Sequence, residues 1–210
     1  MRRPPPRPSP RSDPLQLIYS PLSPFARKVR VVLAEKGMED RVEMVAANPW
    51  EDPESLTRAN PISQVPTLIL DDGSALHDSP IICAWLDAHG DGQRLIPDGE
   101  AQWAVRRLEA VCDAIMETGV KLRQEEMRPE GERSSTHPVR WARTIRRAFD
   151  DLEAEGPGGD LNLGEIALVC ALEYIDFRAP YLNWREGRPN LVARHGALAS
   201  RPSLRATAPA

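Results

Sequence analysis

Short apolar runs that suit β-strands alternate with helical patterns up to about His89, whereas from Gln93 onward the apolar residues recur only at helical spacing. The segment LQLIYS, Leu15 to Ser20, suits a buried strand, and RVEMVA, Arg41 to Ala46, alternates well enough for a second strand. A helix between them completes a βαβ unit, whose two strands are parallel. The change of pattern therefore predicts an α/β half followed by an all-α half.

The first predicted helix begins at a Ser-Pro pair. Ser23 is a good N-cap, and Pro24 fits the first helical position because the N–H of that position is unpaired in any case. Gly37 is a natural end for the helix. Capping alone explains a serine at this point, so the position by itself indicates no chemistry.

The α/β half continues with a hairpin. Thr67 to Leu70 predicts a strand, Asp72-Gly73 is a strong hairpin signal, and Ser74 to His77 predicts the returning strand. The order is therefore βαβ–ββ.

A helix is expected after the hairpin, which completes the order βαβ–ββα. Ser79 is expected to cap it, Pro80 to occupy its first position, and His89-Gly90 to end it. Its predicted buried side comprises Ile81, Ile82, Trp85 and Leu86.

Four helices are predicted in the second half. The third starts near Asn162 and is apolar almost all round, which places it at the centre of a bundle. The predicted organisation is a disordered Pro/Arg-rich extension (1–14), an α/β domain (15–90), a linker (91–98) and an all-helical domain (99–210).

The third of these helices carries a sharp local signal, the segment DLNLGEI. Asn162 is the expected N-cap and Glu165 stands three residues later, which is the spacing of a capping box. Leu161 and Ile166 are placed to form a hydrophobic staple.

Composition excludes several classes of function. The net charge of −4 gives no general attraction to nucleic acid, and no apolar run approaches the ~18 residues of a membrane span. The four histidines are scattered, so no metal site is predicted. Cys83, Cys112 and Cys170 lie in apolar helical patterns and indicate buried thiols in a reducing, cytoplasmic compartment.

Four segments, in this order along the chain, resemble cytosolic glutathione transferases. They are SPLSPFARKVRVVLAEKG, NPISQVPTLILDDGSALHDSPIICAWL, LEAVCDAIMETG and DLNLGEIALVCALEY. The first and third are similar to a bacterial serine-type (Ser-Pro-Phe) subgroup. The resemblance covers nearly the whole chain from Leu15 and implies a thioredoxin-like N-terminal domain followed by a helical bundle.

The resemblance implies that glutathione is the co-substrate and that Ser23 stabilises its thiolate, with Ser20 as the alternative residue. A free thiol has a pKa of ~8.5 and is mostly protonated at neutral pH. A hydrogen bond to a charged group contributes about 1.5–3 kcal/mol, which lowers that pKa by about one to two units. Tyr19 is less suited because it lies within the strand.

The resemblance also implies how the peptide is held. A cis peptide bond before Pro66 is expected, with the backbone of Val65 pairing with the cysteinyl residue of glutathione. Asp78 is expected to meet the ammonium group of the γ-glutamyl residue, and Ser79 its carboxylate.

At the glycine end of glutathione the sequence departs from the family pattern. Many members carry a lysine, glutamine or histidine here, whereas AANPWEDPESLTRA is acidic and has no lysine. Asn48, Trp50 and Arg58 remain open alternatives, in a stretch expected to be irregular with one short helix.

Two further groups of residues can be interpreted either as structural or as functional. For Arg27 and Lys28 we prefer the structural interpretation, a solvated or interdomain charge. The second substrate is expected to bind between the domains, where Met116, Gly119, Tyr174 and Arg178 are possible liners, although such spacing is more typical of a core.

The implied function is a cytoplasmic, homodimeric glutathione transferase that adds the glutathione thiolate to small electrophiles, without a further cofactor or metal. The alternative is a binding or interaction module of the same fold with little or no catalysis, because a fold does not determine a function. A disulfide reductase or thiol lyase would require a cysteine where Ser23 stands.

Overall fold

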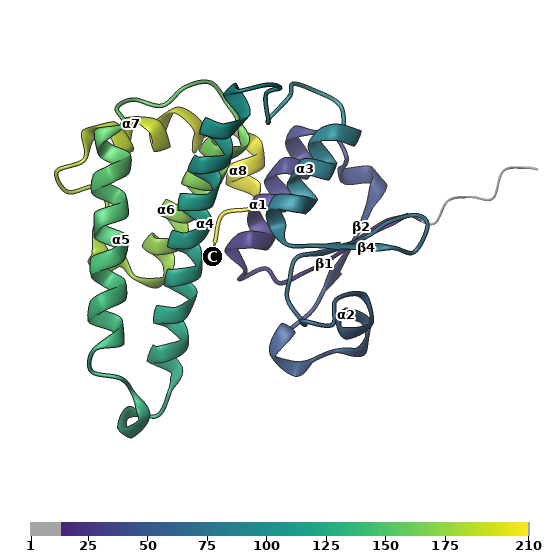
Figure 1. Ribbon diagram of the computed structural model, residues 1–210. Coiled ribbons are helices and arrows are strands. Elements are labelled where there is room, and N and C mark those ends of the chain that lie inside the picture. Colours follow the sequence, from purple (N-terminus) through teal and green to yellow (C-terminus); the bar gives the residue numbers. More distant parts are fainter. Residues whose placement is uncertain (1–13, 210) are drawn as a thin grey trace, which may run out of the picture.

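The computed structural model describes residues 14–209 (Figure 1). The predicted disordered extension lies, apart from Pro14, outside the described residues. The first half comprises β1 (Leu15–Tyr19), α1 (Pro24–Glu35), β2 (Val42–Ala46), α2 (Glu54–Ala59), β3 (Thr67–Ile69), β4 (Ala75–His77) and α3 (Ser79–His89). The second half comprises α4 (Ala101–Met127), α5 (His137–Ala154), α6 (Leu163–Arg178), α7 (Pro189–Leu198) and α8 (Pro202–Ala206).

The four strands form one mixed sheet in the order β2-β1-β3-β4. β1 and β2 are parallel, with Leu15 opposite Val42, while β3 is antiparallel to both β1 and β4. Helices α1 and α3 cover the face of the sheet toward the helical domain, and α2 lies on the other side (Figure 1). The predicted βαβ–ββα order, the parallel first pair and the hairpin are confirmed.

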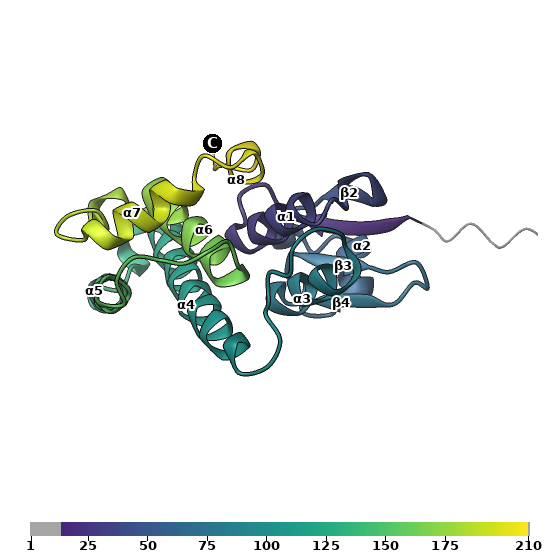
Figure 2. The same ribbon diagram turned by 90° about the horizontal axis from the view of Figure 1, so that it is seen from above.

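The helical domain is built around α6, whose residues from Leu163 to Leu172 are all buried. α4 packs along α6, α5 runs beside α4, and α7 and α8 close the chain (Figure 2). The central position predicted for this helix is confirmed. The sequence patterns did not indicate α8, which returns to pack on α1. No helix in the described range, 14–209, is both long and apolar enough to cross a membrane.

Two details of α3 differ from the prediction. Asp78, not Ser79, occupies the N-cap position, and its side chain forms no capping bond. Ile81, predicted to be buried, is 54% exposed, whereas Ile82 and Leu86 are fully buried. Ile82, Cys83 and Leu86 form the stripe that faces the core, and Ile81 lies beside this stripe.

The predicted capping box of α6 forms only in part. The side chain of Asn162 accepts a hydrogen bond from the backbone N–H of Glu165 at 3.1 Å, as expected of an N-cap. The Glu165 carboxylate does not return the bond but pairs with Arg194 of α7 at 2.8 and 3.3 Å. A buried guanidinium requires a partner, and this requirement determines where Glu165 points. Leu161 packs against the core to which Ile166 belongs, consistent with the staple.

Candidate functional site

Ser23 lies at the N-terminus of α1, where its side chain has a second capability besides capping. Its hydroxyl oxygen accepts a hydrogen bond from the N–H of Ala26 at 3.2 Å, and Pro24 occupies the first helical position. The hydroxyl proton is not used by this bond, so it can be donated to another group. The positive end of the helix dipole lies at the same point and favours an anion.

Ser20 is close to Ser23 but has another place in the structure. Its carbonyl oxygen accepts a hydrogen bond from the N–H of Ser23 at 3.0 Å, which closes the turn between β1 and α1. Tyr19 packs against the core, and the guanidinium of Arg30 lies 5.3 Å from its ring centroid. Of these three candidates, only Ser23 stands at a helix N-terminus.

The start of α3 presents unpaired polar groups. Ser79 is 2% exposed, and its hydroxyl has no partner within the described residues. The backbone N–H of Ser79 lies in the first turn of α3, and it also forms no hydrogen bond within the described residues. Asp78 has φ = 74°, a backbone conformation that non-glycine residues rarely adopt and that is typical of functional sites. An anion at this point would accept bonds from both groups of Ser79.

The loop before β3 leaves part of its backbone unpaired. The side chain of Asn60 is buried and holds the loop by donating to Gln64 O at 3.0 Å and to Thr67 Oγ1 at 3.2 Å. The peptide bond from Val65 to Pro66 is cis, as the resemblance implied. Neither the N–H nor the C=O of Val65 forms a hydrogen bond within the described range, so both are available to a ligand.

The three alternatives for the glycine end lie on the surface. The carboxamide of Asn48 donates to Glu51 and accepts from the N–H of Trp50. Trp50 is 73% exposed, and Arg58 is paired with Glu54 one helical turn away. No geometry favours one of them, so all three remain open.

A buried cation connects the two domains beside this site. Lys28 of α1 has no exposed surface, and its Nζ lies 3.0 Å from Glu109 and 2.7 Å from Asp113, both on α4. Burial alone would lower the pKa of Lys28, but the two carboxylates hold it above its ordinary value. The interdomain role preferred for Lys28 is confirmed. No sequence motif indicated the partners of Lys28, although the spacing of four residues between Glu109 and Asp113 places them on one face of a helix.

Arg27 makes a second contact between the domains. Its guanidinium pairs with Glu173 of α6 and donates to the carbonyl of Leu204 in α8 at 3.2 Å. Burial raises the pKa of Glu173, but hydrogen bonds from His195 and Arg27 outweigh it, and the net shift is downward. The preferred interdomain role is confirmed for Arg27 as well.

The residues expected near a second substrate are mostly packed inside. Met116 is fully buried and Tyr174 is 5% exposed. Gly119 lies so close to Tyr174 and Ile175 that an added Cβ would be 3.1 Å from each side chain. These contacts support the packing interpretation. Arg178, half-buried with its guanidinium 4.2 Å from the Phe177 ring, remains a candidate.

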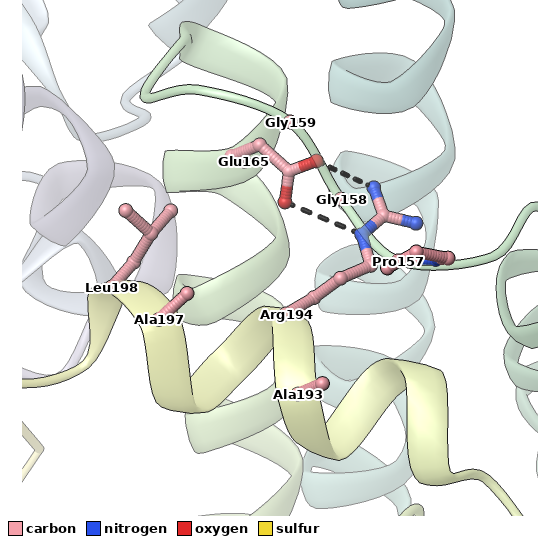
Figure 3. A pocket seen from close by; sticks show the side chains of 8 residues that line it. All are labelled: Pro157, Gly158, Gly159, Glu165, Ala193, Arg194, Ala197 and Leu198. Carbon is pink, nitrogen blue, oxygen red and sulfur yellow. Dashed lines mark hydrogen bonds and ion pairs between the residues drawn. The ribbon is translucent and has the colours of Figure 1, made fainter.

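The helical domain has a small hollow of its own, of about 130 Å³, beneath the loop Pro157–Gly159 (Figure 3). Its polar lining is the ion pair of Glu165 and Arg194, in which each partner satisfies the other. An added Cβ on Gly158 would approach Glu165 to 2.8 Å, so glycine permits the loop to close over the pair. The hollow is therefore explained by packing and is no part of the site.

Cys83, Cys112 and Cys170 are buried free thiols, as predicted. Burial raises the pKa of all three, that of Cys170 to about 11. They are therefore neutral at physiological pH and have no nucleophilic role.

Comparison with known proteins places these groups in a family context. Residues 22–89 match the model of the glutathione S-transferase N-terminal domain, and residues 84–193 match that of the C-terminal domain. The chain is 33% identical to the uncharacterized GST-like protein YibF of Escherichia coli, over 93% of this chain and 98% of that protein.

Two solved structures are similar over nearly their full length. A glutathione transferase family member from Pseudomonas fluorescens with bound glutathione has a TM-score of 0.89 and 37% identity, covering 93% of this chain and 99% of the other. A glutathione S-transferase from Methylobacillus flagellatus with bound glutathione has a TM-score of 0.87 and 36% identity, covering 93% and 100%.

Proposed function

Because the chain belongs to the glutathione S-transferase family, we propose that it binds glutathione and transfers the glutathione thiolate to a small electrophile. The observation that carries the proposal is the hydrogen bonding of Ser23, whose hydroxyl caps α1 and retains a proton to donate to sulfur. Two similar proteins were solved with glutathione bound, which supports the same ligand here.

In the proposed complex the peptide lies between two helix N-termini. Its thiol meets Ser23 at the start of α1, and its γ-glutamyl carboxylate meets the N–H and hydroxyl of Ser79 at the start of α3. The unpaired N–H and C=O of Val65 pair with the cysteinyl backbone, and Asp78 faces the ammonium group. Two of these assignments give a partner to groups that have none within the described residues, the hydroxyl of Ser79 and the backbone N–H and C=O of Val65.

In the proposed reaction the chain lowers the pKa of the thiol and positions the sulfur. The hydroxyl of Ser23 and the helix dipole stabilise the thiolate, which forms a bond to the electrophilic carbon while the leaving group departs. The thiol proton passes to solvent. Arg178 remains a candidate for the surface that meets the second substrate.

The alternative is an interaction module with little catalysis. It is supported by the residues expected to hold the glycine end of glutathione. Arg58 is the only base among the candidates there, and it is paired with Glu54 on the surface. Calorimetric titration with glutathione, combined with a turnover assay on an aryl halide, separates the two proposals. Binding with turnover supports the transferase, whereas absence of both supports the module.

We also propose a homodimer and a cytoplasmic location. A homodimer is typical of the family, and Ile81 on α3 and Trp103 on α4, 54% and 61% exposed, are large apolar residues that such an interface could cover. Three free thiols suit a reducing compartment. Sedimentation equilibrium tests the dimer, because a monomeric mass at micromolar concentration would contradict it.

A further inference from the structure

Arg178, the last residue of α6, is a half-buried cation without a counter-ion. Its side chain forms no ion pair within residues 14–209, and its Nε is buried without a hydrogen-bond partner in the same range. The acids on the neighbouring turns of α6 and α4 each have a cation of their own; the pairs are Glu173–Arg27, Asp176–Arg185 and Glu126–Arg123. The charge of Arg178 is therefore left over.

The guanidinium of Arg178 is held in a way that suits a ligand. Its carbon lies 4.2 Å from the centroid of the Phe177 ring. Stacking on a ring uses the face of a guanidinium and leaves the N–H groups at its edge free for a planar anion. Exposed arginines such as Arg143 of α5 also lack an ion pair in the described range, but water solvates them. A half-buried guanidinium has less water around it and gains more from a partner.

Helices α1 and α6 pack against each other and run in opposite directions. The end of α1 and the start of α6 are both attached to the segment that connects the two domains. The attachments are backbone hydrogen bonds of 2.9 Å, from Asp91 to Lys36 and from Leu163 to Leu95. The start of α1 and the end of α6 therefore lie together at the other end of the domain interface.

The ion pair of Arg27 with Glu173 fixes how these two ends align. Ser23 lies one helical turn before Arg27, and Phe177 lies one helical turn after Glu173. Because the helices are antiparallel, both turns extend from the ion pair in the same direction. Arg178 on its Phe177 ring therefore belongs to the end of the helical domain that faces Ser23.

The surroundings of Tyr174 show that this end of the helical domain is positively charged. Burial raises the pKa of Tyr174, and the charges of Arg178 and Arg123 oppose the shift, so both cations lie close to the phenol. Glu126 balances Arg123 at 3.5 Å, whereas no acid in the described residues balances Arg178. An anion placed here gains the attraction of one uncompensated charge in a partly desolvated position.

We propose that Arg178 binds a carboxylate of the second substrate, so that the chain selects electrophiles that carry this group. The inference rests on the proposed function, because it concerns the reaction partner of the same thiolate. A carboxylate accepts two parallel hydrogen bonds from a guanidinium edge, which fixes its orientation as well as its position. Halogenated carboxylic acids are substrates of this class: sulfur forms a bond to the carbon and halide departs, while the carboxylate stays on Arg178.

The test measures the binding of glutathione conjugates that differ only in the proposed group. S-(2-carboxyethyl)glutathione and S-(4-carboxybenzyl)glutathione are each compared with the corresponding carboxamide, and the two arms differ in reach. Dissociation constants are measured by calorimetry for the wild type, Arg178→Gln and Arg185→Gln. Arg185 provides the matched control, because its guanidinium also lies over an aromatic ring, 3.9 Å from that of Trp184, but is paired with Asp176.

In the wild type, at least one carboxylate conjugate is expected to bind about ten times more tightly than its carboxamide, or better. Arg178→Gln is expected to bring this ratio close to one, and Arg185→Gln to keep it. A ratio near one for both arms in the wild type, or a ratio that survives in Arg178→Gln, would overturn the inference alone while glutathione itself still binds. Failure of the wild type to bind glutathione would overturn the proposed function as well.

A measurement on the wild type covers the case in which Arg178→Gln does not fold. Phenylglyoxal modifies accessible arginines, and mass spectrometry of the digested protein locates the modified residues. At saturation, the preferred carboxylate conjugate should protect Arg178 and its carboxamide should not, while exposed Arg143 should react equally with either ligand present. Arg178 that stays unmodified without ligand, or that both conjugates protect equally, would overturn the inference.

Discussion

The hydroxyl oxygen of Ser23 lies 3.2 Å from the backbone nitrogen of Ala26, which donates a hydrogen bond to it. This bond satisfies one of the amides that a helix N-terminus leaves unpaired. It uses an acceptor position of the hydroxyl and leaves the proton available. One side chain can therefore cap α1 and stabilise a thiolate, and the structural interpretation of Ser23 does not compete with the catalytic one.

Replacing Ser79 by alanine should separate ligand binding from stability. The hydroxyl of Ser79 is buried and has no partner among residues 14–209, and burying such a group costs about 1–3 kcal/mol. We expect Ser79→Ala to be as stable as the wild type or more stable in urea unfolding, and to bind glutathione about tenfold less tightly.

The matched control is Ser203→Ala, since the hydroxyl of Ser203 is also buried but donates to Glu35. This variant should lose about 1–3 kcal/mol of stability and keep its affinity for glutathione. Destabilisation by Ser79→Ala of the same size would contradict the assignment of its hydroxyl to a ligand.

Lys28 should be among the most sensitive positions for stability. Lys28→Met leaves two carboxylates without their buried cation, and breaking a buried pair typically costs about 3–5 kcal/mol. The control, Lys121→Met, removes an exposed lysine from an i, i+4 pair with Glu117 and should cost at most about 0.5 kcal/mol. Guanidinium unfolding measures both, and similar losses for the two variants would exclude a buried interdomain cluster.

The contact of Glu35 with Arg201 should make stability depend on pH in the acidic range. Hydrogen bonds from Arg201 and Ser203 hold the pKa of Glu35 below its ordinary value of 4.5. A lowered pKa means that the stabilisation is present above pH ~4.5 and is lost as the pH falls through the folded-state value. Thermal melts of Glu35→Gln should show a smaller decrease between pH ~5 and ~3 than wild-type melts. An identical decrease would show that this pair does not link α1 to α8 in solution.

The order of helices and strands could be predicted from the sequence because, in each element, the local signals agree with the pattern of burial. Ser23 with Pro24 begins a helix, and the apolar run of α6 fits only a buried centre. Motifs shared with the family also located Ser23, Asp78 and Ser79 at helix starts.

Other features could not be predicted because they depend on contacts between distant segments. Glu165 has the spacing of a capping box, yet Arg194 of α7 draws its carboxylate away. The pairing of Lys28 with Glu109 and Asp113 requires the relative placement of α1 and α4, which no local pattern contains. The same holds for α8, whose few residues are fixed by contacts to α1 such as that between Arg201 and Glu35.

The central claim is that Ser23 stabilises the glutathione thiolate, and the pKa of the bound thiol tests it most directly. Ultraviolet absorbance of the thiolate, followed against pH in the complex, gives this value for the wild type, Ser23→Ala and the control Ser20→Ala. We predict a pKa about one to two units below the free value of ~8.5 in the wild type and Ser20→Ala, and a return toward that value in Ser23→Ala. An unchanged thiol pKa in Ser23→Ala, with glutathione still bound, would contradict the claim.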